Sequence, residues 1–252
     1  MKSVMKQTFK PTDWRVGTVT QIVPEAPGIR SYCFSFDSQI AHYAGQHYEI
    51  RLTAEDGYQA ARLYSAAMPA NGTSNMLQLT IALMADGEVS SYIFSNVTIG
   101  SQLEIRGPLG GYFVWKPEGK SPILLVGGGT GIVPLRAIRL QHQQANASTK
   151  LTLLYSVKTY PYMPYKYELF PRIGQPASDV IVTFTEQAPQ GWLGHEGRID
   201  NAMIQSVLQA YKTTPQVYVC GSTPLVEVVT RQFVEAGVNP SKIKAERFGA
   251  TS

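Results

Sequence analysis

The sequence predicts two domains of different fold class, an N-terminal antiparallel β-sandwich or β-barrel and a C-terminal α/β domain with a parallel sheet. Two observations predict the folds. The first half of the 252-residue chain alternates apolar and polar residues, whereas the second half contains short, uninterrupted apolar runs between helical patterns. A third observation places the boundary, because the polar segment KPEGKSP at 116–122 separates the two patterns. We therefore expect one domain over residues 1–117 and a second over residues 118–252.

The N-terminal strands are predicted from strict alternation. In SYCFSF (31–36) the three aromatic residues would share one face of a strand, and HYEIRL (47–52) and MLQLTIAL (76–83) show the same period. The stretches between such segments are rich in turn-forming residues: PEAPG, DSQ, AEDG and ANGTSN. Several short strands at this spacing are typical of a sandwich or a barrel.

The C-terminal strands are predicted from apolar runs that fit a parallel sheet covered on both faces. These runs are ILLV (123–126), LTLLY (151–155), VIVTF (180–184) and VYVC (217–220). Helix signals lie between them. Asp200 is predicted to cap the helix NAMIQSVLQAYK, Thr223 to cap the next helix with Pro224 in its first turn, and Gly237 to end that helix in a left-handed conformation.

The composition excludes several classes of protein. With 44% hydrophobic and 16% charged residues, the chain has the composition of a globular protein. No apolar run approaches the ~18–20 residues that cross a bilayer, and MKSVMKQTFKPTDWR lacks the apolar core of a signal peptide. We therefore expect a cytoplasmic protein with no transmembrane segment. Its two cysteines, Cys33 and Cys220, do not suggest a disulfide framework.

The charge pattern narrows the range of partners. The net charge of +4 fits solubility alone or an affinity for phosphate-bearing ligands. Basic residues are scattered, without a basic stripe interleaved with aromatic residues, so we expect no binding to nucleic acid. The four histidines lack the spacing of metal ligands and two distant cysteines cannot hold an iron–sulfur cluster, so we expect no metal.

The stretch PILLVGGGTGIVPLRAI (122–138) runs from a predicted strand through a glycine-rich turn into a helix. It does not match the fingerprint G-x-G-x-x-G, because the last position is Ile132 when counted from Gly127 and Pro134 when counted from Gly129. A loop of small residues before a helix still offers free N–H groups and a favourable dipole to a phosphate. The alternative is a tight turn that binds nothing.

The stretch DGEVSSYI (86–93) is a second candidate phosphate site. Gly87 follows a predicted strand, and Ser90 or Ser91 could cap a short helix. An ordinary capped helix is an equally good interpretation. Two candidate phosphate sites on two differently built halves suggest two nucleotide ligands.

Six motifs follow one another along the chain: ARLYSAA (61–67), DGEVSSYI (86–93), RGPLGGYFVW (106–115), LLVGGGTGIVPL (124–135), VYVCGSTP (217–224) and ERFGATS (246–252). In this order they resemble the ferredoxin–NADP+ reductase superfamily, and in particular its short FAD- and NAD(P)-binding oxidoreductases. The resemblance implies that the N-terminal domain is a Greek-key-type barrel that binds FAD and that the C-terminal domain binds NAD(P)H. It also implies an NAD(P)H-dependent flavoprotein reductase, which passes hydride to FAD and electrons on to a separate acceptor.

The resemblance implies roles for the residues of the FAD site. Arg62 would pair with the pyrophosphate, Tyr64 would lie against the isoalloxazine ring, and Ser65 would hydrogen-bond near flavin N5. Taken singly, Arg62 fits a surface ion pair and Tyr64 fits packing within a strand. The remaining implied contacts are Leu63 of the same motif, Ile81, Ala82 and Leu83 lining the site, and the backbone amides of Gly87, Glu88, Val89 and Ser90 at the pyrophosphate.

The same resemblance implies roles in the second domain. Cys220 and Glu246 would border the nicotinamide and flavin N5, Phe248 would cover the other flavin face, and these three with Ser65 would form the catalytic group. The implied dinucleotide contacts are Gly128, Gly129, Thr130 and Gly131 of the loop, and Cys220, Gly221, Ser222 and Pro224 of the Cys-Gly motif. Taken singly, Cys220 fits a small buried apolar residue.

The choice of coenzyme is predicted from YSVKTYPYMPYKYEL (155–169). Ser156, Lys158 and Lys166 lie where the superfamily reads the adenosine 2′-phosphate, and no acidic residue closely follows the strand, which favours NADPH over NADH. NADH remains the alternative. For the acceptor we expect an electron-carrier protein first and a small diffusible molecule second. A non-catalytic flavin-bearing subunit of a larger complex and a barrel that binds no flavin are the rival functions.

Overall fold

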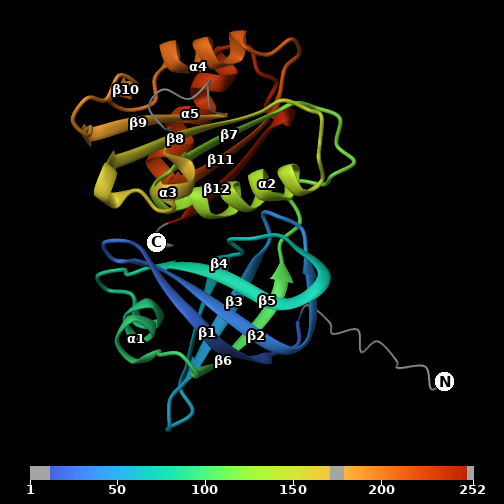
Figure 1. Ribbon diagram of the computed structural model, residues 1–252, viewed down its shortest axis with the longest axis vertical. Helices are drawn as coiled ribbons and strands as arrows, with labels where there is room; N and C mark the ends of the chain where they lie inside the picture. Colours follow the sequence, from blue (N-terminus) through green and yellow to red (C-terminus); the bar gives the residue numbers. More distant parts are fainter. Residues whose placement is uncertain (1–11, 171–178, 249–252) are drawn as a thin grey trace, which may run out of the picture.

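The structure is a computed structural model that describes residues 12–170 and 179–248. An antiparallel and a parallel sheet form two stacked domains, with the N-terminal strands at the bottom of Figure 1 and the parallel sheet at the top. Residues 249–252, the end of the ERFGATS motif, lie outside the described residues. The predicted fold class of both halves is confirmed.

The N-terminal domain is a six-stranded antiparallel sheet with the order β4-β3-β6-β1-β2-β5. Its strands are β1 (Arg15–Ala26), β2 (Ile29–His42), β3 (His47–Thr53), β4 (Gln59–Ser65), β5 (Ala70–Ala82) and β6 (Gln102–Leu109). Helix α1 (Glu88–Asn96) connects β5 to β6. The sheet is curled, so its two edge strands approach each other just beyond β4. There Ala66 forms a single bridge to Leu79 of β5.

The predicted alternation places the barrel core correctly. Tyr32 and Phe34 of β2 and Leu77, Leu79 and Ile81 of β5 are all buried in one apolar cluster. Two predicted turns are wrong, because DSQ (37–39) lies inside β2 and ANGTSN (70–75) inside β5.

Turn-forming residues sit inside these two strands because the pairing is irregular there. The β2–β5 register shifts between residues 35 and 40, so that several residues of β2 face fewer residues of β5. The Asn75 side-chain amide donates to the carbonyl oxygen of Phe36 at 2.8 Å, which satisfies a backbone group that the ladder leaves free. A bulge of this kind bends a strand and tolerates polar residues.

The C-terminal domain is a six-stranded parallel sheet with the order β10-β9-β8-β7-β11-β12. Its strands are β7 (Ile123–Gly128), β8 (Leu151–Thr159), β9 (Val180–Gln187), β10 (His195–Glu196), β11 (Gln216–Ser222) and β12 (Ile243–Phe248). Its helices are α2 (Ile132–Gln144), α3 (Lys166–Leu169), α4 (Asn201–Gln209) and α5 (Thr223–Glu235), with short 3₁₀ turns at η1 (Gly129–Gly131), η2 (Tyr160–Tyr162) and η3 (Pro240–Lys242). The strand order reverses between β7 and β11, which is where open parallel sheets bind ligands.

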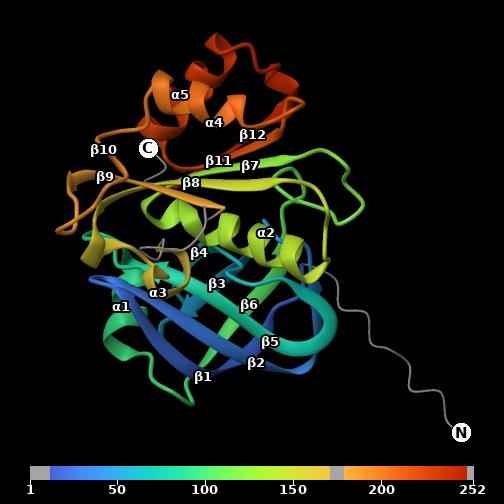
Figure 2. The same ribbon diagram turned by 45° about the horizontal axis from the view of Figure 1, so that its top comes forward.

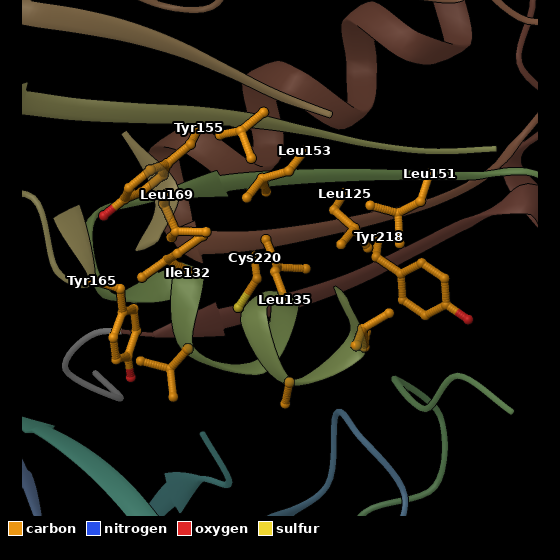
Figure 3. Packing of buried hydrophobic residues seen from close by; sticks show 14 of the residues in the cluster. Leu125, Ile132, Leu135, Leu151, Leu153, Tyr155, Tyr165, Leu169, Tyr218 and Cys220 are labelled. Carbon is orange, nitrogen blue, oxygen red and sulfur yellow. The ribbon is translucent and has the colours of Figure 1, made fainter. Parts of the chain in front are cut away.

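Helices cover both faces of the parallel sheet, as the continuous apolar runs predict. Figure 2 shows α4 and α5 on the outer face and α2 between the sheet and the N-terminal domain. Leu124 and Val126 of β7 pack on the α4/α5 side, whereas Ile123 and Leu125 pack on the α2 side. Figure 3 shows Leu125 within the α2-side cluster. The α2-side cluster also contains Ala67, which follows β4, so apolar packing continues from one domain into the other.

The helix ends test three predictions. Asp200 caps α4, because its carboxylate accepts from the Met203 backbone N–H at 2.8 Å. Gly237 ends α5 with a φ of +87°, and its N–H bonds the Val234 carbonyl at 3.0 Å. The third prediction is half right: Pro224 lies in the first turn of α5, but the cap position is Ser222 rather than Thr223, and it makes no side-chain cap bond.

The predicted domain boundary near residue 117 stays a prediction. Residues 110–122 form the connection between β6 and β7, so the polar segment KPEGKSP occupies its second half. Within the described ranges, no helix is both long and apolar enough to cross a membrane.

Candidate functional site

The glycine-rich loop lies at the point where the strand order reverses. Strand β7 ends at Gly128, the 3₁₀ turn follows, and α2 begins at Ile132. Gly129 has a φ of +54°, a left-handed conformation that L side chains rarely adopt. A Cβ on Gly131 would collide with the backbone carbonyl of Cys220, so this glycine lets the loop pack directly on β11. The loop and the Cys-Gly motif are therefore one unit.

A groove of about 680 Å³ runs along this unit. Eight predicted residues line it: Gly128, Gly129, Thr130, Ser156, Lys158, Ser222, Pro224 and Phe248. Ile29 of β2 also lines the groove, so the N-terminal domain contributes to its wall. A smaller hollow of about 360 Å³ lies at the opposite ends of the strands, near the start of β7 and β11, and contains none of the predicted residues.

A second cluster brings together three predicted catalytic residues from both domains. Ser65 ends β4, whereas Cys220 and Glu246 are directly paired across β11 and β12. His47 of β3 joins them, because it is paired with Ser65 in the sheet and its Nδ1 lies 3.8 Å from Glu246 Oε1. Sequence reasoning missed His47. Its position on the polar face of a predicted strand was visible, but nothing connected it to Glu246.

Burial shifts the pKa values of the groups in this cluster toward their neutral forms. It raises the pKa of the Glu246 carboxyl to about 7 and raises the pKa of the Cys220 thiol well above its usual value. Burial also lowers the pKa of His47, against the attraction of Glu49. Both shifts favour the neutral forms of His47 and Glu246, so burial opposes a full ion pair across their 3.8 Å contact.

Two buried oxygens of the cluster lack a hydrogen-bond partner among the described residues: Ser65 Oγ and Glu246 Oε2. Buried polar atoms are almost always paired in native proteins, so these two oxygens are available for a hydrogen bond to a bound group. Both belong to residues that neighbour His47, one in each domain. The cluster can therefore hold a polar group that the two domains share.

Two residues of the motif on strand β4, Arg62 and Leu63, are exposed. Arg62 is exposed, and its guanidinium donates to the Ala61 carbonyl at 2.7 Å. Leu63 is 53% exposed. Tyr64 is partly buried against the barrel core, and burial raises its pKa to about 12. This arrangement leaves a cation and apolar surface on the outside of one strand.

Comparison with known families identifies both domains. Residues 17–114 match the family of oxidoreductase FAD-binding domains, and residues 125–231 match the family of oxidoreductase NAD-binding domains. The chain belongs to the oxidoreductases that join these two domains. This oxidoreductase is also similar to longer curated proteins. It is 26% identical over 237 residues to the glycine betaine monooxygenase reductase subunit of Chromohalobacter salexigens, covering 92% of this chain and 63% of that protein.

Further similarities extend across the same two domains. The oxidoreductase is 28% identical to NADH-cytochrome b5 reductase 1 of Kluyveromyces lactis, over 79% of this chain and 70% of that protein. A ferredoxin NADP+ reductase from Neisseria gonorrhoeae, solved with FAD and NADP, has a TM-score of 0.76 at 17% identity, over 93% and 98% of the two chains. At that identity the similarity shows the fold. The chain spans 63% of the length of the betaine monooxygenase reductase subunit.

The residues present fit FAD and a nicotinamide dinucleotide. Ser65 Oγ and Glu246 Oε2 offer unused hydrogen-bonding capacity, and the glycine loop leaves open space at Gly129. The side chain of Ile81 is fully buried in the barrel core, so only its backbone could take part in the predicted contact with FAD, whereas Ala82 is half-buried and Leu83 is exposed. The alternation of β5 explains this, because Leu79 and Ile81 share the core-facing side.

The start of α1 also requires a correction. Neither Ser90 nor Ser91 is the cap, because Gly87 holds that position. Ser90 lies inside the first turn, where its hydroxyl accepts from the Met84 N–H and donates to the Gly87 carbonyl, both at 3.1 Å. Val89 is buried, and Glu88 accepts from the Tyr58 hydroxyl at 3.2 Å. Ser90 thus shapes the turn whose first amides remain available to a phosphate.

Of the residues predicted to contact the adenosine 2′-phosphate, only some line the groove. Ser156 and Lys158 line the groove, but Lys166 does not; its ammonium lies 5.8 Å from the ring centre of Tyr160. Lys158 is already paired, since its Nζ lies 3.1 Å from Glu186 Oε1. Arg198 lines the groove and was missed, because no sequence signal connects a residue after β10 with this site. Among the described residues, no group of three or more His, Cys, Asp or Glu side chains comes together as a metal site.

Proposed function

We propose that this oxidoreductase uses NAD(P)H to reduce bound FAD and passes the electrons to a separate acceptor. Bound FAD supplies the redox chemistry, since a flavin takes up hydride at N5 and releases electrons singly. The observation that carries the proposal is the pair of unpartnered buried oxygens, Ser65 Oγ and Glu246 Oε2, which come from the FAD-binding and the NAD-binding domain and both neighbour His47.

The residues of the chain would act by binding, positioning and holding a proton. The loop from Gly128 to Gly131 would bind the coenzyme pyrophosphate with its N–H groups, and Arg62 would bind the FAD pyrophosphate. Ser65 would hydrogen-bond at the edge of the flavin. Glu246, with a pKa of about 7, would take up and release a proton near neutral pH and exchange it with His47 or solvent.

The acceptor is proposed to be a redox protein. The names of the similar proteins support this class, because they include a monooxygenase reductase subunit, a cytochrome b5 reductase and a dioxygenase electron transfer component. A small diffusible acceptor is the second candidate. The two differ in salt dependence, since encounter with a charged protein weakens as ionic strength rises.

The NADPH preference stays a prediction, and Glu186 acts against it. Because Glu186 pairs with Lys158, it both neutralises that cation and repels a 2′-phosphate. Glu186→Gln should raise kcat/KM for NADPH relative to NADH by about two- to fivefold, the range of an exposed charge pair. Steady-state reduction of ferricyanide with each coenzyme measures this ratio.

A matched control is Glu235→Gln, which breaks an exposed pair with Arg231 on α5 outside the groove. It should leave the NADPH/NADH ratio unchanged. An unchanged ratio in Glu186→Gln as well would remove Glu186 from coenzyme selection.

One experiment tests the proposed function as a whole. The absorption spectrum of purified protein is recorded anaerobically before and after adding NADPH or NADH, and then ferricyanide. We expect flavin bands that bleach with at least one coenzyme and return with the acceptor. Flavin bands that neither coenzyme bleaches would instead support the non-catalytic subunit, and protein without flavin bands after reconstitution with FAD would support the barrel that binds no flavin.

A further inference from the structure

A closed hydrogen-bond circuit joins the two domains at Tyr165. This residue lies between η2 and α3 of the NAD-binding domain, and only 6% of it is exposed. Figure 3 shows its hydroxyl pointing away from the parallel sheet toward the strands of the other domain. There the hydroxyl bonds to Thr80 Oγ1 on β5, while the Tyr165 backbone N–H lies 3.4 Å from Glu25 Oε2 on β1.

Two further bonds close the circuit inside the FAD-binding domain. Ser31 of β2 donates its hydroxyl hydrogen to Glu25 Oε1 at 2.7 Å, and its oxygen lies 2.8 Å from Thr80 Oγ1. Each hydroxyl has one hydrogen, and an ionised carboxylate only accepts. The direction of the chain is therefore determined: Tyr165 donates to Thr80, Thr80 to Ser31, and Ser31 to Glu25.

The circuit is rigid for two reasons. Ser31 and Thr80 are directly paired in the sheet and fully or almost fully buried, so neither can replace the Tyr165 hydroxyl with water without moving the strands. The Arg136 guanidinium covers the Tyr165 ring at 4.4 Å, and this arginine also donates to the Ala67 carbonyl at 2.9 Å. Arg136 thus connects α2, which begins at the glycine loop, to the residues that follow Ser65.

The circuit lies next to the coenzyme groove, at a point where residues of both domains line it. Ile29, two residues before Ser31, lines the groove from the FAD-binding side, and Tyr162, three residues before Tyr165, lines it from the NAD-binding side. A bond between Tyr165 and Thr80, together with the bond from Arg136 to Ala67, therefore constrains how far apart these two walls stand. Hydride transfer requires the reacting atoms to lie about 3–3.5 Å apart, so a small shift of one domain slows the reaction.

We propose that Tyr165 is a positioning residue that fixes the NAD-binding domain against the FAD-binding domain through Thr80, Ser31 and Glu25, so that the coenzyme meets the flavin at reactive distance. This inference rests on the proposed function. Loss of the phenol oxygen should slow flavin reduction while the binding of FAD and coenzyme is largely retained, because neither ligand contact is removed.

The test compares Tyr165→Phe with wild-type holoprotein by anaerobic stopped flow over a range of coenzyme concentrations. We expect the limiting rate of flavin reduction to fall about tenfold, since sub-ångström misplacement is costly, with less than about a twofold change in the half-saturating concentration. Thr80→Val should act similarly, and the double variant should be no slower than the single variants, because both remove the same bond.

Tyr211→Phe is the matched control. Its hydroxyl bonds to the Ile123 carbonyl at 2.6 Å within one domain, so the same chemical change should leave the limiting rate near wild type. Wild-type reduction in Tyr165→Phe, or additive effects of the two circuit variants, would overturn the proposal and leave the proposed function intact.

Amide hydrogen exchange provides a readout that does not depend on activity. In flavin-loaded Tyr165→Phe, peptides covering residues 25–31 and 160–166 should exchange faster than in wild type, while peptides of α4 should not change. Unchanged exchange in the first two regions would also overturn the proposal. A wild-type protein whose flavin no coenzyme reduces would contradict the proposed function, and the exchange data would still decide whether Tyr165 holds the domains together.

Discussion

At the scale of single residues, burial shifts the pKa values of the titratable groups in the site toward their neutral forms. Glu246 and Cys220 are paired across two strands, and both have a raised pKa. Ser65, on the other domain, has a buried hydroxyl without a partner. These features cost stability in the isolated chain and are useful only when a ligand supplies the missing contacts. Two predictions follow from Ser65 and Glu246 separately.

Ser65→Ala should fold and bind FAD but reduce its flavin more slowly. Removing one hydrogen bond to a reacting group costs about 1.4 kcal/mol or more, which is about tenfold in rate. Anaerobic stopped flow at the flavin absorbance band measures the rate, and the flavin content of the purified variant controls for binding. Bleaching at the wild-type rate would exclude Ser65 from the reaction.

Glu246→Gln should change how stability depends on pH. The folded carboxyl has a pKa of about 7 against a usual 4.5, so between these values the folded state holds a proton that the unfolded chain has lost. Stability from this group is therefore present below about pH 4.5 and is lost as pH rises toward 7, at a cost of roughly 3 kcal/mol. Glutamine does not titrate, so the free energy of unfolding of the variant should not fall in this way as pH rises.

Urea unfolding of flavin-free protein at pH 5 and pH 8 measures the effect. From pH 5 to pH 8, the free energy of unfolding of Glu246→Gln should increase relative to that of wild type. Glu118→Gln, at an exposed position, should show the same pH dependence as wild type. A constant difference between Glu246→Gln and wild type would show that the carboxyl titrates in its usual range.

At the scale of elements, the glycine loop packs directly against strand β11. The turn at Gly129–Gly131 rests on the backbone of Cys220 and Gly221, and Gly128 lies under Leu225 of α5. The loop departs from the dinucleotide fingerprint in sequence, yet it places free amides at the start of a helix at the reversal point of the sheet. The close approach, rather than the motif spacing, explains the need for glycine at 131.

Gly131→Ala should destabilise the protein by about 1–3 kcal/mol and weaken coenzyme binding, because its Cβ would collide with a backbone carbonyl that cannot rotate away. Thermal unfolding and coenzyme titration measure the two effects. Gly111→Ala is the control, since no atom lies within 4 Å of its Cβ position and its φ is ordinary. Equal melting temperatures for the two variants would contradict the proposed contact.

At the scale of the whole molecule, the two domains share one apolar interface. Ala44 and Ala67 of the first domain belong to the same buried cluster as Leu135 and Ala137 of α2. Polar contacts surround this cluster, including the Gln141 side chain, which accepts from the Ala44 N–H at 2.8 Å. A domain interface that is buried and apolar favours unfolding as a unit.

We therefore expect the flavin-loaded protein to unfold in one transition. Differential scanning calorimetry should give a single peak, and the loss of flavin and of far-ultraviolet circular dichroism should coincide with it. Two separated peaks, with flavin lost in only one of them, would show that the domains are energetically independent.

Much of this protein could be predicted from its sequence. The period of two in the first half and the apolar runs in the second half are local consequences of which faces are buried, so both fold classes and the glycine loop were predictable. Local chemistry likewise predicted the cap at Asp200 and the left-handed end at Gly237. The local pattern was misleading where register shifts place turn-forming residues inside β2 and β5.

Only the tertiary structure decided what lies across the domain interface. His47 meets Glu246 and Tyr165 meets Thr80 because two separately folded sheets pack together, and no period or spacing along the chain encodes such contacts. The same holds for Lys158, which pairs with Glu186 on the neighbouring strand, and for Lys166, which lies outside the groove. Periodicity shows which side of a helix or strand is buried. A site shared by two domains depends instead on how the domains pack, because that packing decides which distant residues meet.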